Sequence, residues 1–207
     1  MSSISSTSSY STIISSSSST ENESIDLSLE ISEMTDIDFI NKFENDEVLM
    51  KDEFQFLGAT YGGEIHSFTS IGIGDCITMF GIGEDGSLFA WHSSSEEDNF
   101  DTELIDKEIV LEKLNSYLSK YVEHIKNLQF NIYLVGGNGS AFSESLCEGM
   151  IAAIPEFFYN ATLIDKFINP TKNIRKTFIT ANFNTNAELH YFFHDRLSSS
   201  ESSEDFA

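Results

Sequence analysis

Two apolar runs on either side of a short turn constrain this chain most. The runs are residues 76–82 and 87–92, and the tetrapeptide Gly83-Glu84-Asp85-Gly86 joins them. Apolar runs bounded by glycine and acidic turn residues are typical of a β-hairpin. We predict a three-residue loop in which Gly86 adopts the left-handed conformation of a bulged turn.

The register of this hairpin decides whether a cysteine meets a histidine. With a three-residue loop, Thr78 lies opposite His92, and Cys76 points from the same face as Thr78. Diagonal neighbours on one face of a sheet are about 7–8 Å apart, so the Cys76 sulfur and the His92 imidazole are within reach of each other. A two-residue loop would instead send the two side chains to opposite faces.

Two amphipathic helices are predicted after the hairpin. Apolar residues recur at three- and four-residue intervals between residues 102 and 126, which indicates a long helix. A short buried strand follows at residues 131–135 and ends at a glycine-rich turn. We expect Ser143 to cap a second helix that runs towards Pro155.

A second hairpin closes the folded region. Residues 176–183 and 188–193 are β-rich and flank a polar turn at residues 184–187. Strand pairs that alternate with amphipathic helices predict an α/β (α+β) domain, in which helices pack on a layered mixed β-sheet. Trp91 should point to the opposite face from His92 and pack under a helix.

Composition divides the chain into four segments. They are a serine-rich leader at 1–24, an acidic N-terminal extension at 25–53, the folded domain at 54–195 and an acidic tail at 196–207. We expect the leader and the tail to be disordered, because they have too few apolar residues to offset the entropy of ordering. In the extension, residues 25–31 alternate like a strand, and Ile37, Ile40 and Phe43 lie at helical spacing; either segment can dock on the domain.

Charge and cysteine content exclude several classes of protein. The chain has 11 Lys and Arg against 34 Asp and Glu, a formal net charge of −23. Such a field repels phosphate backbones, so we expect no nucleic-acid partner. A soluble chain with no membrane span is expected, because no apolar run is long enough to cross a bilayer. Cys76 and Cys147 are too few for a disulfide scaffold and too far apart for a metal knuckle, so no metal or cofactor is predicted.

Cys76 ends a segment with two glycines, Ser70-Ile-Gly-Ile-Gly-Asp-Cys76. Gly72 and Gly74 bring the backbone close to the sulfur, where amide groups can meet a carbonyl oxygen. A cysteine beside a histidine can form a thiolate and an imidazolium, and Ser70 can orient the imidazole. The structural alternative is that Cys76 is a small buried hydrophobe, Ser70 a strand residue and His92 an exposed strand end.

The segment from Ser70 to Cys76, with His92 on the next strand, resembles the bacterial chemoreceptor glutamine deamidase family CheD. That family carries Thr-x-Gly-x-Gly-Ser-Cys, followed by a histidine at nearly this interval. The resemblance covers roughly residues 60–193, including the strand that ends in Leu134-Val135-Gly136-Gly137 and the closing hairpin. The cytotoxic necrotizing factor toxins share this Cys-His deamidase architecture.

The resemblance implies roles for particular residues. Cys76 would be the nucleophile and His92 the general acid and base, while Ser70 would orient the imidazole in place of the family's threonine. The residues implied in substrate binding are Gly72, Gly74, Asp75, Gly136 and Gly137. The two last glycines fit a tight strand-to-helix turn equally well. Asp75 departs from the family, which has a serine at this position. A carboxylate beside the sulfur opposes thiolate formation unless it faces away from the sulfur, and successive strand residues point to opposite faces.

The activity implied is hydrolysis of a glutamine carboxamide on a protein, which converts Gln to Glu. A chemotaxis deamidase would need neither the serine-rich leader nor the acidic tail, and the tail with Phe206 looks like the C-terminal signals of type IV secretion effectors. We therefore predict a secreted virulence effector, or toxin, that acts in the host cytoplasm on a host protein with a basic face. The alternatives are a chemotaxis receptor deamidase in the bacterial cytoplasm, a transglutaminase or thiol hydrolase, and a non-catalytic binding module.

Overall fold

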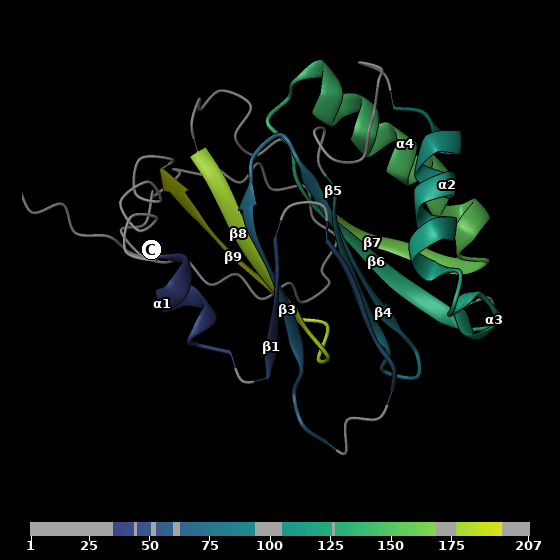
Figure 1. Ribbon diagram of the computed structural model, residues 1–207, viewed down its shortest axis with the longest axis horizontal. Coiled ribbons are helices and arrows are strands. Elements are labelled where there is room, and N and C mark those ends of the chain that lie inside the picture. Colours follow the sequence, from purple (N-terminus) through teal and green to yellow (C-terminus); the bar gives the residue numbers. More distant parts are fainter. Residues whose placement is uncertain are drawn as a thin grey trace, which may run out of the picture.

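Two β-sheets and a layer of helices make up the computed structural model of this chain (Figure 1). The structure describes residues 35–43, 45–50, 53–59, 63–93, 105–125, 127–168 and 177–195. The predicted α/β class, with helices layered on mixed β-structure, is confirmed. The strand predicted at residues 25–31 and the disorder predicted for the leader and the tail lie outside the described residues.

The five-stranded sheet B carries both strands of the first hairpin. Its order is β2 (Phe54–Leu57), β5 (Leu88–Ser93), β4 (Ile77–Gly83), β6 (Gln129–Gly136) and β7 (Asn160–Ile168). Strand β4 pairs antiparallel with β5 and β6, whereas β6 and β7 are parallel. A parallel pair needs a long crossover, and here a helix provides it.

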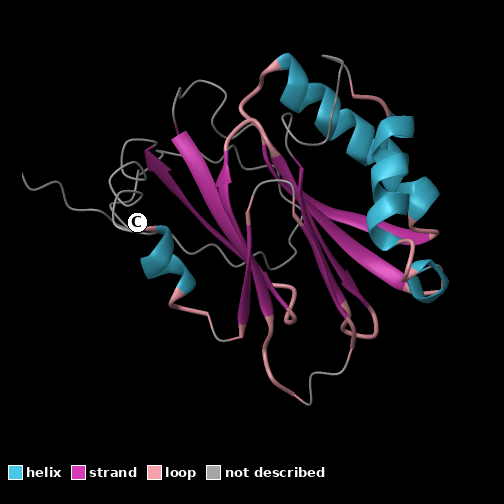
Figure 2. Ribbon diagram, viewed as in Figure 1, coloured by secondary structure: helices cyan, strands magenta, loops and turns pink. Residues whose placement is uncertain are grey.

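The four-stranded sheet A lies on the other side of sheet B from the main helices (Figure 2). Its order is β1 (Asp46–Leu49), β3 (Ser67–Ile73), β8 (Thr177–Asn184) and β9 (Leu189–Asp195). The strands therefore form two mixed sheets where the sequence predicts one. The chain leaves sheet A after β3 and enters sheet B at β4, so residues 74–76 form the bend between the sheets.

Part of the predicted N-terminal extension contributes to sheet A. Helix α1 (Asp36–Ile40) lies beside that sheet (Figure 1), and strand β1 pairs in parallel with β3. The buried residue of α1 is Phe39, whose ring centroid is 4.8 Å from that of Phe192, whereas Ile37 is 64% exposed. Phe43, one of the predicted residues, also contacts sheet A, with its ring centroid 5.5 Å from that of His190 in β9. The segment therefore docks as expected, but the buried residue of the helix is Phe39 and not Ile37.

The helices differ from their predicted bounds in two ways. The long helix predicted at residues 102–126 is divided into α2 (Lys107–Leu118) and α3 (Val122–Ile125). Helix α4 (Ala141–Phe157) begins after Ser140, whose extended backbone and side chain cap it by accepting a hydrogen bond from the Ser143 amide. Ser143 is therefore the third helical residue rather than the cap. No helix in the described part of the chain is long and apolar enough to cross a membrane.

Strand alternation in β4 and β5 separates two cores. Ile77, Met79 and Trp91 face the helices, and the Trp91 ring lies 5.8 Å from the ring of Tyr117 in α2. Phe80 and its neighbours on the other face pack between the two sheets. The prediction that Trp91 packs under a helix is confirmed, and the His92 side chain projects from the opposite face of β5.

Candidate active site

The β4–β5 hairpin has the predicted register. Thr78 lies opposite His92, and Gly86 has a φ of +86° at the end of the three-residue turn. The Asp85 carboxylate accepts hydrogen bonds from the Ser87 amide at 2.9 Å and the Ser87 hydroxyl at 2.7 Å, which stabilises the turn. The turn thus fixes the face from which the His92 imidazole projects.

A β-bulge in β3 places Ser70 between the sheets. The pairing of β3 with β8 shifts by one residue between Ser70 and Ile73, and Gly72 has a φ of +69° there. Because the bulge inserts one extra residue, Ser70 and Ile73 both face the interior although they are three positions apart. Both side chains are fully buried.

Ser70 joins the two sheets by hydrogen bonds. Its Oγ lies 3.0 Å from His92 Nδ1 and 2.7 Å from Thr78 Oγ1. All three residues are at most 1% exposed. With Nδ1 protonated, Ser70 Oγ accepts from the imidazole and donates to Thr78, which leaves proton exchange with a thiol to Nε2. The contact predicted between Ser70 and His92 is present in the structure.

Thr78 belongs to this cluster, although the sequence pattern does not mark it as a site residue. A signal for it exists, because the predicted register already places Thr78 opposite His92. What the register alone does not indicate is that β3 brings a second hydroxyl to the same point from the other sheet.

Cys76 lies immediately before β4 and belongs to the core between the sheets, where it is 5% exposed. Two glycines hold its main chain. The Gly137 amide donates to the Cys76 carbonyl at 2.8 Å, and Gly136, with a φ of +125°, pairs with Ile77. A Cβ at Gly136 would lie 2.5 Å from the Cys76 carbonyl oxygen. These glycines thus position Cys76, and their role in substrate binding stays a prediction.

Asp75 faces the sulfur. The Cys76 thiol donates to Asp75 Oδ1 at 3.6 Å. The expectation that Asp75 faces away relied on strand alternation, but residues 74–76 lie in the bend outside both strands. Gly74 brings this bend against β8, because a Cβ there would lie 2.9 Å from the Phe178 ring. Contacts therefore hold the main chain of the bend on both sides of Asp75.

The other ionisable side chains that the structure describes give no second centre. His66 lies 3.9 Å from Glu64, and His190 lies 3.9 Å from Glu188, all of them outside this cluster. Among the described residues, no three His, Cys, Asp or Glu side chains are grouped as metal ligands. Cys147 of α4 is buried in the core between the helices and sheet B.

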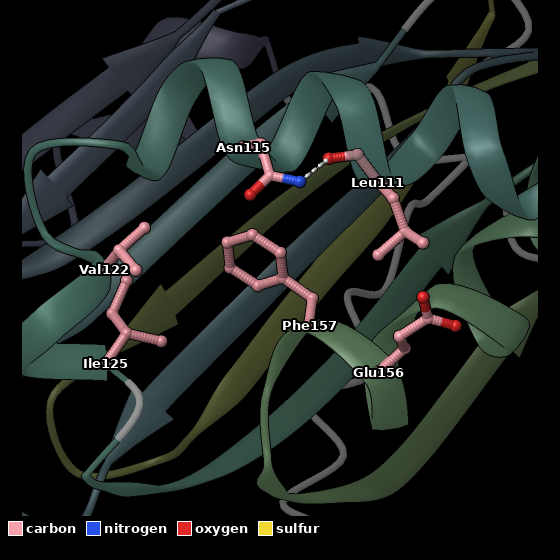
Figure 3. A pocket seen from close by; sticks show the side chains of 6 residues that line it. All are labelled: Leu111, Asn115, Val122, Ile125, Glu156 and Phe157. Atoms are coloured by element: carbon pink, nitrogen blue, oxygen red, sulfur yellow. Dashed lines mark hydrogen bonds between the residues drawn. The ribbon is translucent and has the colours of Figure 1, made fainter.

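A pocket of about 190 Å³ lies in the helical layer (Figure 3). Its lining residues are Leu111, Asn115, Val122, Ile125, Glu156 and Phe157. The polar groups of this lining are engaged locally: the Asn115 amide donates to the Leu111 carbonyl at 2.7 Å, and Glu156 accepts from Lys107 at 2.8 Å. The lining contains no cysteine and no histidine. We take the cluster of Ser70, Thr78 and His92, next to the bend that carries Cys76, as the candidate active site.

Comparison with known proteins gives weak structural similarity and no sequence match. No family model matches the chain, and no curated protein matches it. Among solved structures it is similar to the C-terminal domain of CNFy from Yersinia pseudotuberculosis, with a TM-score of 0.37 and 11% identity. The match covers 71% of this chain and 55% of that chain. The neighbour loosely fits the cytotoxic necrotizing factor resemblance, but at this TM-score it carries no inference about fold or activity.

Proposed function

We propose that this chain is a cysteine-dependent protein-glutamine deamidase, with Cys76 as nucleophile and His92 as general acid and base. The observation that supports this proposal most is the 3.0 Å contact between His92 Nδ1 and Ser70 Oγ, next to the bend that carries Cys76. An oriented imidazole that reaches a thiol activates a cysteine, and we propose that His92 Nε2 reaches the Cys76 sulfur.

In the first half of the reaction, the Cys76 thiol transfers its proton to His92. The thiolate then attacks the carboxamide carbon of a glutamine, and a C–S bond forms as the carbonyl oxygen takes up negative charge. We propose backbone amides of residues 72–76 as the donors that stabilise that oxyanion. His92 gives its proton to the departing nitrogen, the C–N bond breaks and ammonia leaves.

In the second half, water hydrolyses the thioester. The neutral His92 imidazole takes a proton from the water as it attacks the thioester carbon. The C–S bond breaks, the sulfur is reprotonated, and glutamate is the product. The new carboxylate adds one negative charge to the substrate protein, which is enough to disturb a contact with an acidic neighbour.

The proposed setting follows from charge and composition. A net charge of −23 favours a protein substrate with a basic face, because complementary potentials increase the rate of encounter. We propose a host protein as that substrate, and delivery of this chain into the host cytoplasm by a bacterial type IV system. The serine-rich leader and the acidic tail are the sequence features behind the second proposal.

The direct test is mass spectrometry of candidate host proteins after incubation with wild type, Cys76→Ser or His92→Asn. We expect conversion of a specific glutamine to glutamate, with release of ammonia, only with wild type. The thermal unfolding of each variant should be measured alongside, because both positions are buried. No conversion across a host lysate, together with an unreactive Cys76 thiol, would remove the proposal.

A second candidate is a binding module that does no chemistry. The observation in its favour is that Cys76 is 5% exposed among apolar side chains, which also suits a structural cysteine. If this candidate is right, the Cys76→Ser protein binds its partner as wild type does, and the effect of binding is unchanged. A transglutaminase would be identified by incorporation of an added primary amine, because it forms the same thioester.

A further inference from the structure

We propose that Asp75 selects glutamines that are followed or preceded by a Lys or Arg, and that this cation relieves the repulsion between Asp75 and the Cys76 thiolate. The inference rests on the proposed function and adds to it the chemical class of the sequence around the target glutamine. It makes Asp75 a specificity residue at the site.

Three features of Asp75 lead to this assignment. Its Oδ1 lies 3.6 Å from the Cys76 sulfur. Its side chain is partly exposed, whereas Cys76 is 5% exposed, so a partner arriving from solvent meets the carboxylate more readily than the sulfur. Among the described residues, none forms an ion pair with Asp75.

The position of the carboxylate is built into the fold. Asp75 lies in the bend between the two sheets, with Gly74 packed against Phe178 and the Cys76 carbonyl held by Gly137. Movement of either neighbour would disturb the packing on Phe178 or the hydrogen bond from Gly137. The carboxylate is therefore presented to the sulfur by a fixed main chain.

A carboxylate at this distance acts differently on the two states of the sulfur. It accepts a hydrogen bond from the neutral thiol, and it repels the thiolate. A cationic side chain that pairs with Asp75 compensates its charge and removes that repulsion when the proton moves from sulfur to His92. The same contact thus contributes to binding and to the chemical step, and a substrate without the cation loses both.

Matched peptides test the selection. Three peptides of one length carry Lys, norleucine or Glu beside the same glutamine. Norleucine keeps the aliphatic side chain of Lys but carries no charge. We expect wild type to deamidate the Lys peptide at least about tenfold faster than the norleucine peptide in kcat/KM, and the Glu peptide more slowly still. Asp75→Asn should lose this preference and gain activity on the norleucine peptide.

Glu112→Gln is the matched control, because it removes one negative charge from exposed residues of α2 in the helical layer. We expect this variant to keep the wild-type preference. Equal preference for Lys in wild type and Asp75→Asn would overturn the assignment of Asp75, as would a loss of preference in Glu112→Gln of the same size.

A measurement without substrate separates this assignment from the proposed function. In a Cys147→Ser background, Cys76 is modified with a cationic and an anionic methanethiosulfonate of similar size. The thiolate attacks the reagent sulfur, a disulfide forms and methanesulfinate leaves. We expect Asp75→Asn to lower the ratio of cationic to anionic rates about tenfold, and Glu112→Gln to leave it near the wild-type value.

The outcomes are distinguishable. A shifted ratio with no deamidation of any peptide or of any protein in a host lysate supports the electrostatic role of Asp75 and overturns the proposed function. Deamidation of all three peptides at one rate, with an unshifted ratio, supports the proposed function and overturns the role of Asp75. If neither reagent modifies Cys76, both are overturned.

Discussion

In the proposed mechanism, the Thr78 hydroxyl directs the hydrogen bond between Ser70 and His92. Thr78 Oγ1 lies 2.7 Å from Ser70 Oγ, and when it accepts the Ser70 proton, Ser70 is left to accept from His92 Nδ1. That arrangement favours the tautomer in which Nε2 can take a proton from the thiol. Thr78 is therefore a positioning residue that acts through Ser70.

Removal of this hydroxyl should reduce the rate without weakening substrate binding. In Thr78→Val, Ser70 turns its proton to Nδ1, and we expect kcat to fall about tenfold with KM nearly unchanged, the effect of about one buried hydrogen bond. Thr78→Ser restores the hydroxyl and should restore the rate. Nitrogen-15 NMR of the His92 ring measures the tautomer directly, and a Val variant with the wild-type tautomer and the wild-type kcat would contradict this role.

Asp46 supports the outer face of sheet A at an electrostatic cost. Its Oδ1 accepts from the Ser67 hydroxyl at 2.8 Å and from the Asn182 amide at 3.1 Å. Burial raises the pKa of Asp46, and these hydrogen bonds offset only part of that effect. Because the folded-state pKa lies above the unfolded value, the stabilising contribution is complete below the ordinary carboxyl range and is lost as the pH rises through the folded-state pKa.

The free energy of unfolding of Asp46→Asn should therefore increase relative to that of wild type as the pH rises from acid to neutral. Asparagine keeps an acceptor oxygen for Ser67 and Asn182 and carries no charge to desolvate. Urea unfolding of both proteins at a series of pH values measures the difference in free energy. A difference that stays constant with pH would contradict the raised pKa of Asp46.

The β6–α4 junction holds the bend that carries Cys76, and it has no room for a side chain. Gly136 has a φ of +125°, and a Cβ there would meet the Cys76 carbonyl oxygen and an Ile73 methyl group, each at 2.5 Å. Gly136→Ala should destabilise the fold by about 1–3 kcal/mol and slow the alkylation of Cys76. Gly58→Ala, where a Cβ meets nothing within 4 Å, is the matched control in urea unfolding and alkylation. A Gly136→Ala protein as stable and as reactive as this control would contradict the close contact.

Elements with local signals could be predicted from the sequence. The β4–β5 turn needs a left-handed residue, which is Gly86, and the Asp85 side chain closes it. Loop length and register therefore follow from a few adjacent residues. Trp91 and His92 then face opposite cores because strand side chains alternate. The cap of α4 is harder, since Ser140 and Ser143 are both suitable caps, and the backbone decides between them.

Features that depend on distant segments could not be predicted in this way. The bulge near Gly72 is defined only by the pairing of β3 with β8, more than a hundred residues later in the chain. The partition into two sheets, and the parallel pairing of β1 with β3, likewise have no local signature. The side that Asp75 faces could not be derived from strand alternation, because the bend interrupts both strands.

The whole molecule carries a field that should affect its encounter with substrate. With a net charge of −23, deamidation of a basic protein should slow several-fold between about 50 and 300 mM salt, because screening weakens the attraction. A short neutral glutamine peptide should show a much weaker dependence. Initial rates of ammonia release measure both, and equal salt dependence of the two substrates would contradict long-range attraction.

The two sheets, the bulge and the hairpin turn together serve one purpose in the proposed function, which is to make the Cys76 sulfur nucleophilic through His92. The alkylation rate of Cys76 at neutral pH, in a Cys147→Ser background with and without His92→Asn, tests this most directly. We expect the His92→Asn protein, once shown to be folded by its thermal unfolding, to react at least about tenfold more slowly. Equal rates in the two folded proteins would mean that the histidine does not activate the thiol.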